Sequence, residues 1–233
     1  MDTKSIKSRK FINLVIKRLK EAYPDQMHTQ LKYSNKWELL VAVILSAQTK
    51  DISVNAITKK LFEDFPKPED LLSLEPEDLY PYLRSIGLYK GKSKRLIDAA
   101  KMVVNQFDSR VPNNTKDLMK IPGVGRKVAN VVLSEGFGIN EGIAIDTHCI
   151  TVSNRLGLAD TTNPAVIERE LMRITAKREW NNISHLFIAL GRDTCQARKK
   201  ICERCVLNDI CISSTVKNDT YKNRNIHNIN RLK

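Results

Sequence analysis

The sequence contains few signals for β-strands. Segments in which β-branched and polar residues alternate between turns do not recur, whereas apolar residues repeat at three- and four-residue spacing. No apolar run approaches the roughly 18 residues that a membrane-spanning helix needs. The N-terminal residues lack the charged-then-apolar plan of a secretory signal. We therefore expect an all-α protein that is intracellular and has no membrane partner.

Acidic residues are also scarce relative to basic ones. The chain has 39 Lys and Arg against 26 Asp and Glu, a formal net charge of +13 and a sequence pI near 9.6. Such an excess favours a polyanionic partner, with nucleic acid first and an anionic membrane second. In a reducing intracellular compartment structural disulfides are not expected, so clustered cysteines suggest a metal centre instead.

Helical periodicity runs through most of the chain. A first helix is expected to bury Phe11, Leu14, Val15, Ile16 and Leu19. The segment 37–47 is apolar nearly all round and is expected to form a buried helix. The next helix is expected to begin at an N-cap, Asp51, and to turn Ile52, Ile57, Leu61 and Phe62 inward. Three more helices are expected, over 93–107, 165–176 and 180–190. Pro68 and Pro76 each begin a short helix, and Gly87 and Gly91 are expected to bracket a turn.

The segment Ile121-Pro122-Gly123-Val124-Gly125-Arg126-Lys127 leads directly into an apolar helix. Glycines allow a sharp turn and a close backbone approach, and the unpaired N–H groups of the following helix start can bind a phosphate. The helix N-terminus and the neighbouring Arg126 both disfavour the charged form of Lys127. A neutral lysine amine is a nucleophile that can form a Schiff base. Local physics leaves open the alternative that Lys127 only contacts a phosphate.

Four of the five cysteines lie in one short segment, at positions Cys195, Cys202, Cys205 and Cys211. Four thiolates suit either zinc or an iron–sulfur cluster. Zinc sites usually pair their ligands as two close couples, and here only the second and third cysteines are that close, so the spacing favours iron and sulfur. The fifth, Cys149, is expected to be a small core residue.

The segment 118–133 resembles the helix-hairpin-helix of the endonuclease III family of DNA base-excision glycosylases, and the resemblance extends from about Trp37 to Cys211. It implies that Lys127 is the catalytic nucleophile. Ile145-Asp146-Thr147-His148 matches the family segment that carries the second catalytic residue, which here is Asp146. By itself Asp146 would be interpreted as the N-cap of the next helix, accepting from Thr147 or His148, so both roles are expected. His148 is interpreted as structural.

The resemblance also implies a [4Fe-4S] cluster on the four cysteines, and a basic loop of Arg198, Lys199 and Lys200 that holds DNA phosphates. The hairpin backbone from Gly123 through Val124, Gly125 and Arg126 would hold another phosphate. Gln48 and Leu88 would fill the gap left by a base flipped out of the duplex. The chain departs from the commonest bacterial pattern at Thr49-Lys50 and at Leu190, which leaves its preferred lesion open.

The resemblance implies two helical lobes with a cleft between them. We expect a six-helix barrel over 29–139 that contains the helix-hairpin-helix at about 115–133. A cluster domain would combine 1–28 with 140–212, and 213–233 would form a flexible basic tail. Lys127, facing the cleft beside Asn130 and Ser134, would lie opposite the inward-facing Val124, Val128, Val131 and Val132.

The implied activity is that of a bifunctional DNA glycosylase and AP lyase. It would remove oxidised or ring-saturated pyrimidines and cut the strand by β-elimination through a lysine Schiff base. The expected partner is double-stranded DNA with damaged bases or abasic sites, bound by a monomer in the cytoplasm or nucleoid of a prokaryote. Two alternatives stay open: a monofunctional mismatch glycosylase of the same fold, and a non-catalytic iron–sulfur module that binds DNA.

Overall fold

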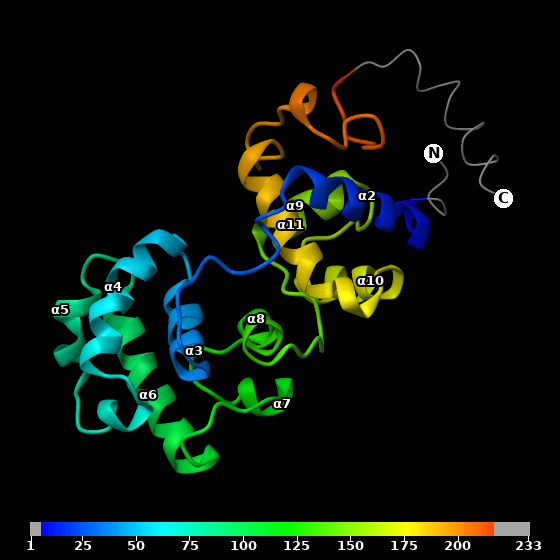
Figure 1. Ribbon diagram of the computed structural model, residues 1–233. Helices are drawn as coiled ribbons and strands as arrows, with labels where there is room; N and C mark the ends of the chain where they lie inside the picture. Colours follow the sequence, from blue (N-terminus) through cyan, green and yellow to red (C-terminus); the bar gives the residue numbers. More distant parts are fainter. Residues whose placement is uncertain (1–5, 217–233) are drawn as a thin grey trace. The chain divides into compact units, whose positions relative to one another are not determined.

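The computed structural model describes residues 6–216, and these residues form two compact units (Figure 1). Among the described residues, one unit combines 6–27 with 145–216, and the other is His28–Ala144. Within the described residues helices account for the regular structure, and the β contribution is one isolated bridge between Cys195 and Lys200. The predicted all-α class is confirmed. The part of the basic tail at 217–233 lies outside the described residues.

The unit formed by 28–144 is built around α3 (Lys36–Leu45), in which every residue from Trp37 to Leu45 is buried. An all-round apolar helix must be enclosed by other elements. The surrounding elements are α4 (Asp51–Asp64), α5 (Tyr80–Leu83), α6 (Tyr89–Phe107), α7 (Thr115–Leu118), α8 (Arg126–Phe137) and the 3₁₀ turns η1 (Pro68–Leu71) and η2 (Pro76–Leu79). The helices α4, α6 and α8 all contact α3.

This unit extends to Ala144 because the segment after α8 packs back onto it. Gly142 to Ala144 are buried. The carboxylate of Glu141 accepts a hydrogen bond from the backbone N–H of Thr115 at 3.0 Å, which ties the segment to the first residue of α7. Residues 140–144 therefore belong to the same unit as α7, whereas the sequence predicted them in the cluster domain.

The unit formed by the chain ends contains α2 (Arg9–Ala22), α9 (Thr147–Arg155), α10 (Pro164–Ile174) and α11 (Trp180–Asp193), with the turns η3 (Lys177–Glu179) and η4 (Cys202–Arg204). Helix α11 packs against both α9 and α2. Its contact with α9 requires a glycine at position 191, because a Cβ there would lie 2.8 Å from Cβ of His148. His148 is thus held by packing, in keeping with the structural role predicted for it.

Some predicted details are wrong, because in the folded chain a helix buries a different face or begins at a different residue. Leu14 and Ile52 are exposed, at 38% and 77%, while Ile12 is fully buried instead. Asp51 is the first residue of α4 and not its N-cap, which is Lys50. Gly91 does not end a turn, because it lies inside α6, which begins at Tyr89. Cys149 is fully buried, as predicted.

Candidate functional site

The hairpin between α7 and α8 has the backbone that its glycines predict. Gly123 has a φ of +87°, which a residue with a side chain adopts only under strain. A Cβ at this position would lie 3.3 Å from Cγ2 of Ile44 and 3.5 Å from Cδ of Arg95. Gly125 is the N-cap of α8, and its carbonyl accepts the N–H of Ala129 at 2.9 Å. The turn is therefore pressed against the end of α3 and the first part of α6.

Lys127 is the second residue of α8 and its side chain is exposed. The predicted inward face is confirmed, since Val124 and Val132 are buried and Val128 and Val131 pack against the core. Asn130, predicted beside Lys127, is instead 3% exposed, because it points into the unit with its helical neighbours. The hairpin thus anchors α8 through apolar contacts and leaves Lys127 at the surface, at the positive end of the helix.

Asp146 is the N-cap of α9. Its carboxylate accepts the backbone N–H of Cys149 at 2.8 Å, one residue further along than the expected Thr147 or His148. The side chain is half-buried. Lys127 belongs to the unit formed by 28–144 and Asp146 follows directly after that unit, so the two candidate catalytic residues lie on different units.

Gln48 and Leu88 share an unusual backbone conformation. Both have a positive φ, 54° and 59°, and both side chains are exposed, Leu88 at 61%. A left-handed conformation costs a residue with a side chain roughly 1–2 kcal/mol. Leu88 therefore combines a strained backbone with an apolar side chain left in solvent. Strained backbone conformations are concentrated at functional sites.

The four clustered cysteines come from the segment after α11. Cys195 comes directly after the C-cap of the helix, Cys202 begins η4, and Cys205 is the C-cap of η4. The N–H of Cys211 donates to the carbonyl of Leu207 at 2.9 Å. In the described part of the chain, no three Cys, His, Asp or Glu side chains are grouped so that they could hold a single metal ion.

The thiols nevertheless influence one another. Burial raises the pKa of Cys205, and the charges of Cys195 and Cys202 raise it further. Burial also raises the pKa of Cys211, and the other three cysteines add to that effect. Four thiols in one half-buried neighbourhood repel each other when ionised, and a bound cationic metal centre removes that repulsion and keeps its ligands deprotonated. The donor set therefore fits a thiolate-bound metal cluster.

Arg155, at the end of α9, organises the loop that follows Cys195. Its Nη1 donates to the carbonyls of Cys195 at 3.0 Å and Gln196 at 2.9 Å, and to Sγ of Cys195 at 3.3 Å. Its Nη2 donates to Ala197 at 2.8 Å. The sequence analysis missed this residue, because its partners lie about 40 positions further along the chain.

The basic loop that follows is exposed at Arg198, Lys199 and Lys200. Nζ of Lys200 donates to the carbonyl of Ser213 at 2.8 Å, and residue 200 also pairs with Cys195 in the isolated bridge. These contacts fix the base of the loop and leave Arg198 and Lys199 exposed at its tip. The arrangement suits electrostatic binding of a polyanion.

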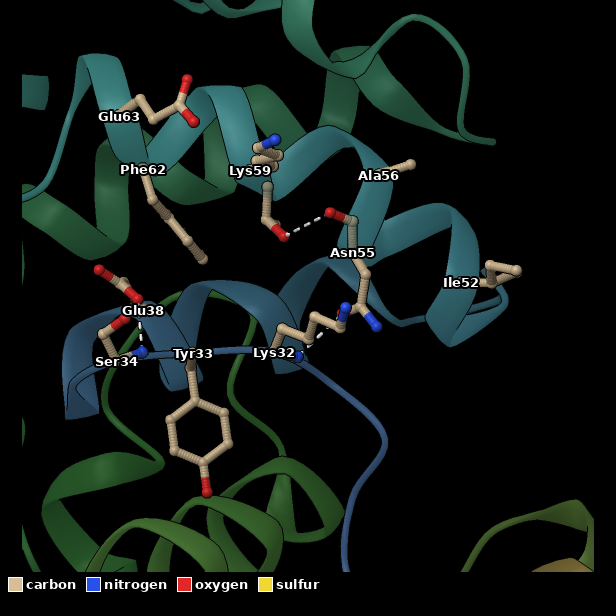
Figure 2. A pocket seen from close by; sticks show the side chains of 11 residues that line it. Lys32, Tyr33, Ser34, Glu38, Ile52, Asn55, Ala56, Lys59, Phe62 and Glu63 are labelled. Carbon is tan, nitrogen blue, oxygen red and sulfur yellow. Dashed lines mark hydrogen bonds between the residues drawn. The ribbon is translucent and has the colours of Figure 1, made fainter.

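The unit formed by 28–144 also has a surface pocket that is separate from the candidate site residues. Figure 2 shows it between the segment 32–38 and α4, with Lys32, Glu38, Asn55 and Phe62 among its lining residues. The backbone N–H of Lys32 donates to Oδ1 of Asn55 at 2.9 Å, which closes one side of it. Its lining contains none of the predicted site residues. It carries none of the expected chemistry.

The prediction from the sequence also lacked Lys92, which is among the largest fully buried side chains of the described residues. A signal for it existed. Lys92 occupies the buried stripe of α6, in line with Leu96, Ala99 and Val103, where the helical pattern calls for apolar residues. A lysine at such a position indicates a specific polar partner.

Comparison with known proteins places the chain in a family. Residues 41–177 match the HhH-GPD superfamily base excision DNA repair proteins. The chain is 45% identical over 183 residues to the endonuclease III of Rickettsia conorii, an alignment that covers 78% of this chain and 87% of the relative. It is 39% identical over 197 residues to the endonuclease III of Escherichia coli, covering 84% of this chain and 92% of the relative.

None of the described helices is long and apolar enough to cross a membrane.

The fold matches equally well. A solved structure of a trapped endonuclease III–DNA covalent intermediate superimposes with a TM-score of 0.83 at 39% identity, covering 88% of this chain and 96% of the other. A thermostable thymine-DNA glycosylase shares the fold with a TM-score of 0.77 at 22% identity. Sequence and fold thus agree on one assignment: the chain belongs to the endonuclease III family, within the HhH-GPD superfamily of base excision DNA repair proteins.

Proposed function

We propose that Lys127 is the nucleophile with which this chain removes damaged pyrimidines from DNA and then cuts the strand. Family membership makes the chain a base excision repair glycosylase with AP lyase activity, and its partner is DNA. The observation that carries the assignment of Lys127 is its place. It is an exposed amine in the first turn of α8, directly after a glycine hairpin whose N–H groups can hold the backbone of a DNA strand.

The proposed reaction uses that placement. With the damaged nucleotide flipped out of the helix, the neutral amine of Lys127 attacks C1′ of its sugar, and the base leaves with the electron pair of the glycosidic bond. Ring opening gives a Schiff base, which acidifies the C2′ proton. Removal of that proton forms a C2′–C3′ double bond and expels the 3′ phosphate. Water then hydrolyses the imine, which releases the cut sugar and regenerates the lysine amine. One residue thereby serves both activities.

The two activities should therefore proceed together. We expect the wild-type protein, incubated with a duplex that contains one thymine glycol, to release the base and to cut the strand with the same time course. Gel analysis of the end-labelled strand, with and without added alkali, measures the two steps separately. Base release that yields nicks only after alkali would instead identify a monofunctional glycosylase.

Asp146 is proposed to stabilise the positive charge that develops on the sugar and to transfer protons. Because Asp146 also caps α9, its substitution must separate the two roles. Asn is as good an N-cap as Asp, so Asp146→Asn keeps the bond to the N–H of Cys149 and removes only the charge.

We expect Asp146→Asn to lower the single-turnover rate of base release by about 10²-fold or more, with a melting temperature close to that of the wild type. Asp146→Ala should lose the cap as well, at a cost of about 1 kcal/mol in unfolding free energy. An Asp146→Asn protein with normal activity would show that the residue serves only as a cap.

Cys195, Cys202, Cys205 and Cys211 are proposed to hold a [4Fe-4S] cluster. A donor set of four thiols within one short segment supports this assignment, and the bound cluster would supply structural and electrostatic support rather than bond cleavage. Arg198, Lys199 and Lys200, within the loop between the first two ligands, would then contact DNA phosphates. Gln48 and Leu88 are proposed to enter the gap left by the flipped nucleotide.

A further inference from the structure

Lys92 holds the end of α3 from the inside. Its side chain is 1% exposed, and its Nζ donates to the carbonyl of Leu45 at 2.9 Å and to Oγ1 of Thr49 at 2.6 Å. Leu45 is the last residue of α3, where carbonyl groups have no helical partner and a cation is favoured by the helix dipole. The two bonds of Lys92 therefore span the turn 46–48, one on each side of it.

Gln48 is the left-handed residue of the turn that these two bonds span. The backbone of the turn makes one bond of ordinary length, from the N–H of Thr49 to the carbonyl of Ser46 at 3.0 Å, and one long one, from the N–H of Ala47 to the carbonyl of Ile44 at 3.5 Å. The hydroxyl of Thr49 accepts a hydrogen bond from Nζ of Lys92 and donates one to the carbonyl of Ala47 at 3.3 Å. A left-handed Gln48 persists only where surrounding contacts impose it, and the Lys92 bonds are such contacts.

The backbone of the same lysine reaches the second proposed gap-filling residue. The N–H of Lys92 donates to the carbonyl of Leu88 at 3.0 Å, which is the first helical bond of α6. Leu88 is the N-cap of α6 in the left-handed conformation. Position 92 thus connects to Leu88 through the main chain, whereas the lysine side chain bonds to the segment that carries Gln48.

Packing alone does not account for a lysine here. Burial lowers the pKa of Lys92, and the charge of Arg95 lowers it further, so the site disfavours the ammonium form. An apolar side chain of similar length would fill the same space without that penalty. What such a side chain could not do is donate hydrogen bonds to Leu45 and Thr49.

We propose that Lys92, with Thr49 as its partner, is a positioning residue that fixes Gln48 in the conformation needed to fill the gap in a duplex. This inference rests on the proposed role of Gln48. Gap filling matters only where a base leaves a stacked duplex, and an abasic site in a single strand leaves no such gap. The loss of positioning should therefore affect duplex substrates and spare the lyase reaction on single strands.

The test compares Lys92→Met and Thr49→Val, which keep the buried volume, with Lys101→Met, an exposed lysine of the same helix. We expect Lys92→Met and Thr49→Val to slow single-turnover base release from a thymine glycol duplex by about tenfold, the effect of roughly 1.4 kcal/mol. Cleavage of a single-stranded abasic oligonucleotide should stay within about twofold of wild type, and Thr49→Ser should retain the wild-type rate on both substrates. The control should match the wild type throughout.

A double-mutant cycle links the effect to Gln48. If Thr49 acts through Gln48, then combining Thr49→Val with Gln48→Ala should slow duplex base release little more than Gln48→Ala alone. Equal losses on duplex and single-stranded substrates, or multiplying effects in the double mutant, would overturn the proposal. Wild-type protein that fails to cleave the single-stranded abasic site would instead contradict the Schiff-base function itself. Thr49→Val, a surface-proximal change, decides the matter even if Lys92→Met does not fold.

Discussion

Replacing Lys127 with alanine is expected to abolish the covalent complex that borohydride traps with damaged DNA, and to lower strand cleavage by at least about 10³-fold. The reason is chemical: the Schiff base needs the ε-amine, and removal of a nucleophile leaves only binding and electrostatic stabilisation. The measurement is gel detection of the adduct together with single-turnover cleavage of a thymine glycol duplex. A trapped complex in the alanine variant would contradict the assignment.

Lys127→Arg serves as the matched variant. Arginine keeps the positive charge beside the hairpin, but its guanidinium stays protonated and cannot act as the nucleophile. We expect this variant to bind a damaged duplex nearly as well as the wild type and to form no adduct. If Lys127 only contacts a phosphate, then the arginine variant should remain active. The alanine variant should in that case show weaker DNA binding, with a salt dependence reduced by about one ion.

Replacing Cys205 with serine is expected to remove the metal cluster and to destabilise the unit formed by the chain ends. The loss of a bound metal centre is among the few single changes that cost more than about 4 kcal/mol. For a chain of this size that corresponds to a fall in melting temperature of roughly 8 °C or more. Iron and sulfide analysis, visible absorption and thermal unfolding measure the effect independently of activity.

Cys149→Ala is the control for that experiment. Cys149 is fully buried, and its thiol contacts the carbonyl of Ser184 at 3.6 Å, so the substitution removes a cysteine without removing a proposed ligand. We expect it to retain the full iron and sulfide content. A wild-type preparation that contains zinc in place of iron would overturn the cluster assignment, and so would a Cys205→Ser protein with unchanged iron content.

The proposed chemistry was readable from short segments because each of its residues lies within a local motif. The hairpin conformation follows from Gly123 and Gly125, and the placement of Lys127 follows from the helix that they begin. The spacing of the four cysteines likewise lies within one segment. Helical periodicity located the main helices to within a few residues, since the 3.6-residue repeat is a local property.

Local patterns failed where a helix offers more than one apolar face. Leu14 and Ile52 satisfy the helical spacing as well as their buried neighbours do, yet both are exposed. Which stripe is buried is decided by the neighbouring helices, and no short segment contains that information. Asn130 is a further example. It shares a side of α8 with the exposed Lys127, yet it is buried, because the neighbouring elements cover its position.

Local sequence patterns were sufficient to predict the helical class, the hairpin with its lysine, the capping aspartate and the set of four thiols. The contacts that hold these parts in place emerge only from the folded chain. Lys92 meets Leu45 across 47 positions and Arg155 meets Cys195 across 40. Hydrogen bonds between residues so far apart depend on how the helices pack, and packing is a property of the whole unit that no segment of the sequence encodes by itself.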